Sequence, residues 1–269
     1  MLDYRILLNK YGRPVARQGE HWELIADETI VSKMVNILSS WENNNLLLIG
    51  PAGTGKTSAI QALDRRIREG KCPSLTGVSI FEISLDTFFA DIPDNRRDER
   101  GARWNNLLRE AMEYRVVIWC DEAHRLFTSK DGLVEAAKPF LTDGRLRMIL
   151  STTNDEFREY MESNKAFVRR FERVNITEPG RATTQAILLR RADGMYPTLN
   201  ITEEVCGLIV ELSSHISQLR ERHDPARSLS VLTRVAACAV NEGQSVTLNF
   251  VRNVIEDQFT DDGLRTVGF

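Results

Sequence analysis

Residues 50–57 match the phosphate-loop pattern G-x-x-x-x-G-K-[ST] at every fixed position, since they read Gly50-Pro51-Ala52-Gly53-Thr54-Gly55-Lys56-Thr57. An apolar run from Leu46 to Ile49 precedes them, and a helical pattern begins at Ser58. We therefore place the pattern on a strand–loop–helix. There the glycines let successive N–H groups turn toward one point, and the helix N-terminus adds partial positive charge. The stretch predicts a phosphate site formed by Gly50, Pro51, Ala52, Gly53, Thr54, Gly55, Lys56, Thr57 and Ser58.

Two adjacent carboxylates, Asp121 and Glu122, follow a second apolar run at residues 116–120. Ligands of open α/β sheets bind at the carboxyl ends of parallel strands, where this pair is expected to lie. Lys56 is predicted to reach the β and γ phosphates, and the Thr57 hydroxyl and Asp121 to hold Mg²⁺. Glu122 is predicted to polarise the attacking water. The pair turns the predicted phosphate site into a site of nucleoside triphosphate hydrolysis.

Composition sets wide limits on the protein class. The chain has 269 residues, with 35 Lys and Arg against 38 Asp and Glu, for a net charge of −3. The overall charge gives no reason to expect binding to nucleic acid or an anionic membrane, although a local basic patch remains open. The four cysteines lack metal-ligand spacing, and there is no apolar stretch of membrane-spanning length and no secretion signal. We expect a soluble cytoplasmic protein with reduced thiols.

Strand and helix patterns alternate as far as residue 178, and only helical patterns follow. This order predicts an α/β fold, a P-loop NTPase in which a parallel sheet is sandwiched by helices, followed by a small all-helical domain. The predicted strands span residues 46–49, 78–84, 116–120, 147–151 and 173–177. Predicted domains are an N-terminal arm (1–22), the α/β nucleotide-binding domain (23–178), the helical domain (179–258) and a C-terminal tail (259–269).

Five stretches that begin at the carboxylate pair occur in a fixed order. They are Asp121-Glu122-Ala123-His124, Ala137-Lys138-Pro139-Phe140-Leu141, Gly144-Arg145-Leu146-Arg147, Thr152-Thr153-Asn154-Asp155-Glu156-Phe157-Arg158-Glu159-Tyr160 and Arg169-Arg170-Phe171. With this order, the chain resembles the AAA+ ATPases and, among them, the first ATPase module of the Clp-type unfoldases. The resemblance covers residues 22–180 well and the helical domain only loosely. It implies ATP and Mg²⁺ as cofactors, and it makes the helical domain a lid.

The resemblance also assigns roles to residues outside the two nucleotide motifs. Arg169 and Arg170 match the arginine fingers that act in the ATP site of a neighbouring subunit, which implies a ring or helical homo-oligomer. Either Thr153 or Asn154 matches the first sensor, which positions the water. Leu24 and Ile25 match the apolar pair against the adenine ring, although ordinary core packing would explain them equally well. Arg227 lies where a second sensor is expected, and an exposed surface side chain is the alternative.

One departure from the family concerns the client. Unfoldases hold polypeptide with an aromatic residue followed by Arg-Gly, whereas this chain has Glu99 before Arg100-Gly101. Trp104 is expected to anchor the following helix in the core. Our first hypothesis is a Clp-like ATPase that remodels a protein or protein complex. The alternative is an ATP-dependent DNA-binding regulator, of the transposition-helper or helicase-loader type, that contacts nucleic acid through Arg96, Arg97, Arg100 and Arg103.

Overall fold

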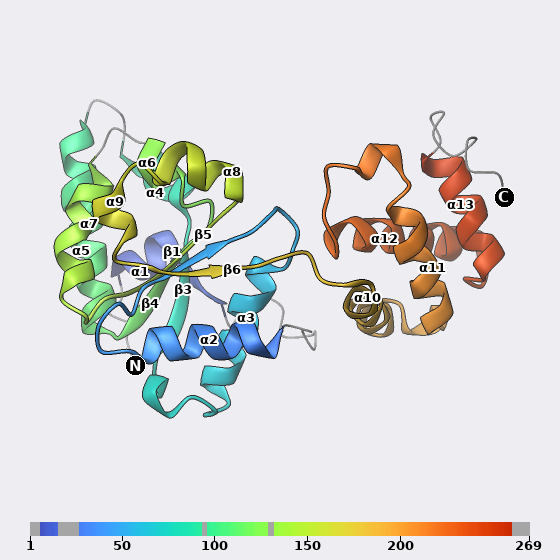
Figure 1. The fold of residues 1–269 in the computed structure, drawn as a ribbon, viewed down its shortest axis with the longest axis horizontal. Helices are drawn as coiled ribbons and strands as arrows, with labels where there is room; N and C mark the ends of the chain where they lie inside the picture. Colours follow the sequence, from blue (N-terminus) through green and yellow to red (C-terminus); the bar gives the residue numbers. More distant parts are fainter. Residues whose placement is uncertain (1–5, 16–26, 93–95, 129–131, 260–269) are drawn as a thin grey trace. The chain divides into compact units, whose positions relative to one another are not determined.

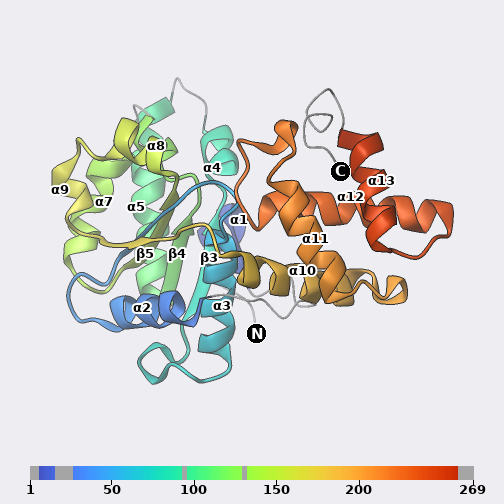
Figure 2. The same cartoon turned by 45° about the vertical axis from the view of Figure 1, so that its right-hand side comes forward.

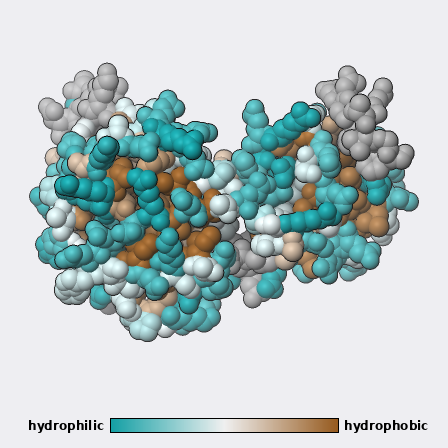
Figure 3. All heavy atoms as spheres, viewed as in Figure 1, coloured by the Kyte–Doolittle hydropathy of each residue, from teal (hydrophilic) through white to brown (hydrophobic). Residues whose placement is uncertain are grey.

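The computed structural model describes residues 6–15, 27–92, 96–128 and 132–259, which divide into two compact units. The α/β unit contains the described residues up to Gly50 and those from Lys56 to Ile176 (Figure 1). The helical unit contains Pro51–Gly55 and the residues from Thr177 onward. On the face drawn in Figure 3, polar side chains cover most of each unit, and apolar residues show between them. Within the described ranges, no helix is long and apolar enough to cross a membrane.

A six-stranded sheet with the order β1-β3-β4-β5-β2-β6 forms the centre of the α/β unit, as far as the chain is described. The four strands β3, β4, β5 and β2, together with the edge strand β6, pair in parallel, as the alternating pattern predicted. The phosphate loop follows β2, and Asp121 follows β4, so both motifs lie at the same edge of the sheet. The strands are β1 (Gly12–Pro14), β2 (Leu46–Ile49), β3 (Ser79–Ile83), β4 (Val116–Cys120), β5 (Arg147–Thr152) and β6 (Glu172–Asn175).

Helices cover both faces of this sheet, as Figures 1 and 2 show, and this confirms the predicted sandwich. One core lies between the sheet and α2 (Glu28–Ser39) and α3 (Lys56–Arg68). The other lies beneath α5 (Arg97–Glu113), α7 (Leu133–Thr142) and their neighbours. The shorter helices of this unit are α1 (Ile6–Tyr11), α4 (Leu85–Asp91), α6 (Arg125–Thr128), α8 (Asn154–Glu156) and α9 (Lys165–Val168).

The described part of the segment predicted as an arm belongs to the α/β unit. Its strand β1 pairs antiparallel with β3, with Arg13 opposite Glu82, and adds an edge to an otherwise parallel sheet. Its helix α1 begins against Glu110, whose carboxylate oxygens accept the N–H groups of Leu7 and Leu8 at 3.0 Å each. A carboxylate satisfies the unpaired N–H groups of a helix N-terminus and complements its dipole. Residues 6–15 are therefore an integral part of the sheet and its covering layer.

The helical unit has its own apolar core, as the pattern after residue 178 predicted. Its helices are α10 (Arg181–Met195), α11 (Glu203–Ser213), α12 (Ala226–Glu242) and α13 (Leu248–Phe259). Leu188, Ile209, Val231 and Val251 bring the four helices together, each with no exposed surface. Two threonines cap helices of this unit, because the hydroxyls of Thr202 and Thr247 accept N–H groups from the first turns of α11 and α13.

Candidate nucleotide site

The first glycine of the phosphate loop is required by strand packing. A Cβ added at Gly50 would lie 2.2 Å from the carbonyl oxygen of Ile176, which follows the neighbouring strand β6. The two later glycines are required by backbone conformation, because Gly53 has φ +81° and Gly55 has φ +100°. Residues 51–55 belong to the helical unit, where the Ala226 N–H donates to Gly53 O at 3.3 Å. The loop thus has the backbone geometry that its sequence predicts.

Lys56 opens α3 and turns back toward the strand that precedes it. Its Nζ donates to Gly50 O at 2.7 Å, and the residue is half-buried. Burial lowers the pKa of Lys56, while the negative charges of Asp121 and Glu156 raise it in opposition. Thr57, the next residue, is exposed.

Asp121 is held by two donors on one oxygen. Its Oδ1 accepts the Ser151 hydroxyl at 2.6 Å and the Glu122 N–H at 3.1 Å. In the described part of the chain its Oδ2 has no hydrogen-bond partner, so one carboxylate oxygen remains for a cation shell. A hydroxyl from Thr57 and a carboxylate from Asp121 are the oxygen ligands that Mg²⁺ prefers. The donor set that the sequence predicted therefore fits this ion.

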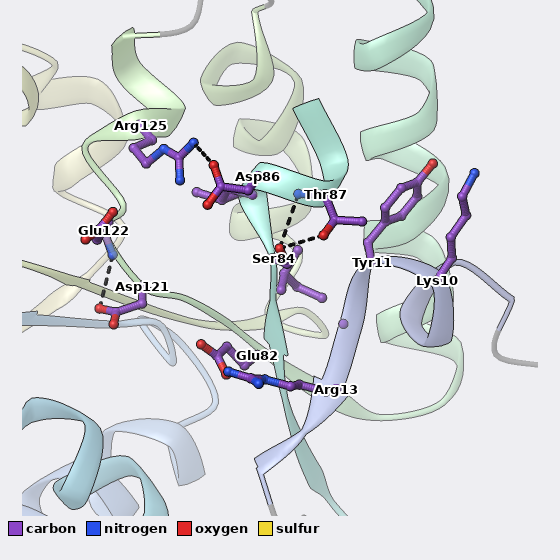
Figure 4. A pocket seen from close by; sticks show the side chains of 13 residues that line it. Lys10, Tyr11, Arg13, Glu82, Ser84, Asp86, Thr87, Asp121, Glu122 and Arg125 are labelled. Atoms are coloured by element: carbon purple, nitrogen blue, oxygen red, sulfur yellow. Dashed lines mark hydrogen bonds and ion pairs between the residues drawn. The ribbon is translucent and has the colours of Figure 1, made fainter. Parts of the chain in front are cut away.

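Glu122 occupies a strained backbone position and has an exposed side chain. Its φ is +48°, a left-handed value that is uncommon for residues other than glycine. The Ala123 N–H donates to Ser151 O at 2.9 Å, which ties the turn to β5. Figure 4 shows Asp121 and Glu122 at one side of a pocket of about 580 Å³, which the Arg125–Asp86 ion pair also lines. At this strained turn, the Asp121 carboxylate is hydrogen-bonded to Ser151 on β5, whereas the Glu122 side chain is exposed.

The residues around the predicted first sensor have distinct environments. Thr153 caps α8, since its hydroxyl accepts the Glu156 N–H at 3.3 Å, and Glu156 Oε2 accepts the Thr153 N–H at 2.9 Å. Asn154 is exposed at the first position of this helix. Thr152, which the sequence analysis did not single out, is buried at the end of β5 and donates to Glu156 at 3.0 Å. The structure leaves Thr153 and Asn154 side by side, with Thr153 engaged as a cap.

Glu156 is a second residue that the sequence analysis did not assign. Burial would raise its pKa, but hydrogen bonds from Thr153 and Thr152 and the nearby His124 lower it. His124 Nδ1 lies 3.3 Å from Glu156 Oε2, and its ring packs on Tyr160 at 5.6 Å. The capping-box pattern T-x-x-E was the available signal for this carboxylate. Glu156 is therefore held in its charged form beside Thr152 and Thr153 at the end of β5.

The two predicted arginine fingers differ in how they are held. Arg169 directly follows α9 as its C-cap residue, and its exposed side chain has no hydrogen-bond or ion-pair partner among the described residues. Arg170 is half-buried and donates to the Thr142 hydroxyl at 3.2 Å and to the carbonyl of Ala166. Of the pair, Arg169 is the cation available to a partner.

The four-arginine surface proposed for nucleic acid is not formed as the sequence suggested. Arg100 is only 6% exposed and donates to Ile92 O at 2.8 Å. Arg103 donates to the Tyr11 hydroxyl at 3.0 Å, and Arg96 pairs with Glu99 at 2.6 Å. The side chain of Arg97 lies outside the described set. Linear spacing predicted a cluster of phosphate ligands, but Arg100 packs inward as part of the fold.

Arg227 and the adenine contacts complete the predicted site residues. In the helical unit, Arg227 Nη2 donates to Asp224 Oδ2 at 2.6 Å and to Glu178 Oε1 at 3.1 Å. Its side chain is 17% exposed, so it is an ordered cation and not a free surface residue. Burial would raise the pKa of Glu178, but hydrogen bonds from Asp224 and His223 and the charge of Arg227 lower it. Leu24 and Ile25 lie outside the described residues.

The chain is similar to a known family of ATPases and to bacterial chaperones. Residues 46–178 match the model of the ATPase family associated with various cellular activities (AAA). The chaperone ClpB of Tropheryma whipplei is 34% identical over 233 residues, which are 82% of this chain and 33% of that protein. The ClpB of Staphylococcus epidermidis is 33% identical over 245 residues, 86% of this chain and 28% of the relative. The chain therefore spans about a third of the length of these relatives.

Solved structures of a related chaperone share the fold. The Hsp104–ADP complex of S. cerevisiae superposes with a TM-score of 0.85 at 26% identity, over 97% of this chain and 47% of that one. Hsp104 with ATPγS and FITC casein gives a TM-score of 0.82 at 25% identity, again over 97% and 47% of the two chains. The similarity thus covers nearly all of this chain and about half of each solved one.

Proposed function

Since this chain belongs to the AAA ATPases through residues 46–178, we propose that it binds Mg²⁺-ATP at the phosphate loop and hydrolyses it. The observation that carries the proposal is the arrangement of the two motifs: Gly50 opens the phosphate loop directly after β2, and Asp121 follows β4, at the carboxyl edge of one parallel sheet. A half-buried lysine at the start of α3 and a carboxylate that follows β4 suit a triphosphate with its counter-ion.

The predicted site residues of the α/β unit have distinct parts in this reaction. Lys56 leaves Gly50 O and binds the β and γ phosphates, while the loop N–H groups bind the remaining phosphate oxygens. Thr57 and Asp121 hold the Mg²⁺ shell, and the ion supplies charge neutralisation at the phosphates when bound. Glu122 accepts a proton from the water as the water oxygen bonds to the γ-phosphorus. The bond between that phosphorus and the β–γ bridging oxygen breaks, and ADP leaves with the bridging oxygen. Thr153 or Asn154 orients that water from the end of β5.

The remaining site residues act through neighbours. We propose that Arg169, and with it Arg170, reaches the ATP site of an adjacent copy in a ring or helical homo-oligomer, because Arg169 is an exposed cation without a local partner among the described residues. Leu24 and Ile25 are proposed to contact the adenine. Arg227 is proposed as the second sensor of the lid, released from Glu178 and Asp224 when it engages the γ-phosphate.

We propose that this hydrolysis drives the remodelling of a protein client or protein complex, and that the chain acts in the cytoplasm. ClpB relatives are named as chaperones, and Hsp104 was solved with casein. The domain boundaries that go with this proposal are 23–178 for the nucleotide-binding domain and 179–258 for the lid. Nucleic acid is not favoured as the target, since Arg100 is buried and Arg103 is held by Tyr11.

A binding and hydrolysis experiment tests the proposal. The wild-type chain should release phosphate from ATP in the presence of Mg²⁺, and Lys56→Ala should bind no fluorescent ATP analogue, because it loses the phosphate cation. Gel-shift with duplex DNA and co-sedimentation with casein, each with and without ATPγS, then separate the two clients. ATP-dependent retention of casein without a DNA shift is expected. A DNA shift that requires ATPγS, with no retention of casein, would contradict the protein-directed proposal.

A further inference from the structure

Three polar side chains lie on one face of the sheet, beneath α3, where apolar residues otherwise form the core. Trp119 lies opposite Ile149 in the β4–β5 register, so Ser151 is its diagonal neighbour two residues further along β5. Asp121 follows Trp119 by two residues along the chain and leaves the sheet on the same side. Diagonal neighbours of this kind are within reach of an aromatic side chain. The period of the two strands therefore brings Trp119, Ser151 and Asp121 together.

The hydrogen bonds among these residues have a fixed direction. Trp119 Nε1 donates to Ser151 Oγ at 2.8 Å, and the Ser151 hydroxyl lies 2.6 Å from Asp121 Oδ1. The indole nitrogen can only donate, so the serine oxygen accepts from Trp119 and its single proton points to the carboxylate. Trp119 is 1% exposed and Ser151 is fully buried, so water does not compete for either bond. The result is a one-way chain of donors that ends at Asp121.

This chain of donors restrains the carboxylate group itself. Oδ1 receives both the Ser151 hydroxyl and the Glu122 N–H, which leaves Oδ2 as the oxygen without a partner in the described structure. Two donors on one oxygen fix the plane of the carboxylate and select the oxygen that faces the cation. Hydrogen bonds around a metal-ligating group orient it and tune its affinity.

We propose that Ser151 is a positioning residue for Asp121, held in its donor orientation by Trp119, and that this pair sets the affinity of the site for Mg²⁺. The inference rests on the proposed Mg²⁺-ATP site. Neither Ser151 nor Trp119 is proposed to contact the nucleotide. Trp119 acts only through Ser151, and Ser151 acts only through Asp121.

The variants Ser151→Ala, Trp119→Phe and the double variant test this order. The readout is the affinity for ADP, measured by calorimetry in Mg²⁺ and again in EDTA, together with direct Mn²⁺ binding to the ADP complex by EPR. Ser151→Ala should weaken Mg²⁺-dependent binding about 10-fold and leave binding in EDTA unchanged. Trp119→Phe should weaken Mg²⁺-dependent binding less, because the Ser151 hydroxyl still donates to Asp121 but is no longer oriented by the indole N–H. Thr184→Val removes an equally buried hydroxyl in the helical unit and should change the affinity for ADP neither in Mg²⁺ nor in EDTA.

The double variant separates positioning from general damage to the fold. Because Trp119 acts through Ser151, adding Trp119→Phe to Ser151→Ala should cause no further loss of Mg²⁺-dependent affinity. The urea midpoint should move in the opposite direction and rise above that of Ser151→Ala, since the buried N–H left without an acceptor is removed. If the affinity losses of the two substitutions add in the double variant, or if Ser151→Ala keeps the wild-type Mg²⁺ dependence, the role of Ser151 and Trp119 is overturned while the proposed Mg²⁺-ATP site stands. A wild-type chain that binds ADP equally in Mg²⁺ and EDTA would overturn the proposed site, and this inference with it.

Discussion

Gly50→Ala should unfold the α/β unit at lower denaturant, because the phosphate loop begins where two strands approach closely. The added Cβ would lie 2.2 Å from Ile176 O and 3.1 Å from Ile176 C, both of which are backbone atoms. A carbon and a carbonyl oxygen approach to about 3.3 Å, so β2 and β6 would have to separate by roughly 1 Å. The Ile176 N–H donates to Ile49 O at 2.8 Å, and this bond would be strained or lost.

The expected cost follows from these two effects. Overpacking of a closely packed site costs about 1–3 kcal/mol, and a lost backbone hydrogen bond about 1 kcal/mol. We therefore expect the free energy of unfolding of the α/β unit to fall by about 2–4 kcal/mol. Urea unfolding followed by tryptophan fluorescence measures it, because Trp104 and Trp119 are both buried in this unit.

Gly180, in the helical unit, provides a control for the glycine-to-alanine change itself, because an added Cβ meets no atom within 4 Å there and φ is −66°. Gly180→Ala should change the free energy of unfolding by less than about 1 kcal/mol. If Gly50→Ala unfolds at the wild-type urea concentration, the close approach of β2 and β6 at the phosphate loop is wrong.

Three further predictions concern charged residues. Arg169→Ala should bind ATP normally and lose turnover, and mixing it with Glu122→Gln subunits should restore part of the phosphate release; wild-type turnover of Arg169→Ala alone would exclude a finger that acts in trans. Glu156 has a native pKa below its ordinary value of 4.5, so its charge stabilises the fold above that pH and the benefit is lost as pH falls through the native value. The thermal unfolding of wild type and Glu156→Gln should therefore differ at pH 7 and converge as the pH falls through the lowered native pKa of Glu156, and a constant difference would refute this. Arg100→Ala should lower the free energy of unfolding by about 2–4 kcal/mol, because its buried hydrogen bonds are lost. Arg96→Ala removes an exposed ion pair and should lower the free energy of unfolding by under about 1 kcal/mol in the same urea assay. Equal effects of the two substitutions would show that Arg100 is not part of the core.

The parts of the fold that depend on local pattern could be predicted from the sequence. Residues 46–49 and 116–120 are short apolar runs that end in the phosphate loop and the carboxylate pair, and both are strands with the predicted bounds. The helical unit was predicted from the loss of strand patterns after residue 178. These features depend on neighbours in the chain, which a single sequence displays directly.

The parts that depend on distant contacts could not be predicted in this way. Strand β1 has three residues, and its position depends on β3 and on Glu110, about a hundred residues away. The burial of Arg100 depends on carbonyls at the end of α4, so its spacing from other arginines was misleading. Ser151 looked like the end of an apolar strand, and only the β4–β5 register reveals Trp119 as its donor. Register and side-chain direction across a sheet are properties of the fold.

Hydrolysis by Glu122→Gln tests the central claim most directly, because the substitution keeps the shape of the side chain and removes only its basicity. Glu122 is exposed and makes no contribution to the core, so the variant should fold and bind fluorescent ATP as the wild type does. Single-turnover hydrolysis of radiolabelled ATP in Mg²⁺ should slow by about 10²–10⁴-fold, the usual contribution of a general base. ATP binding at the wild-type affinity with hydrolysis at the wild-type rate would contradict the assignment of Glu122 and of the site built around it.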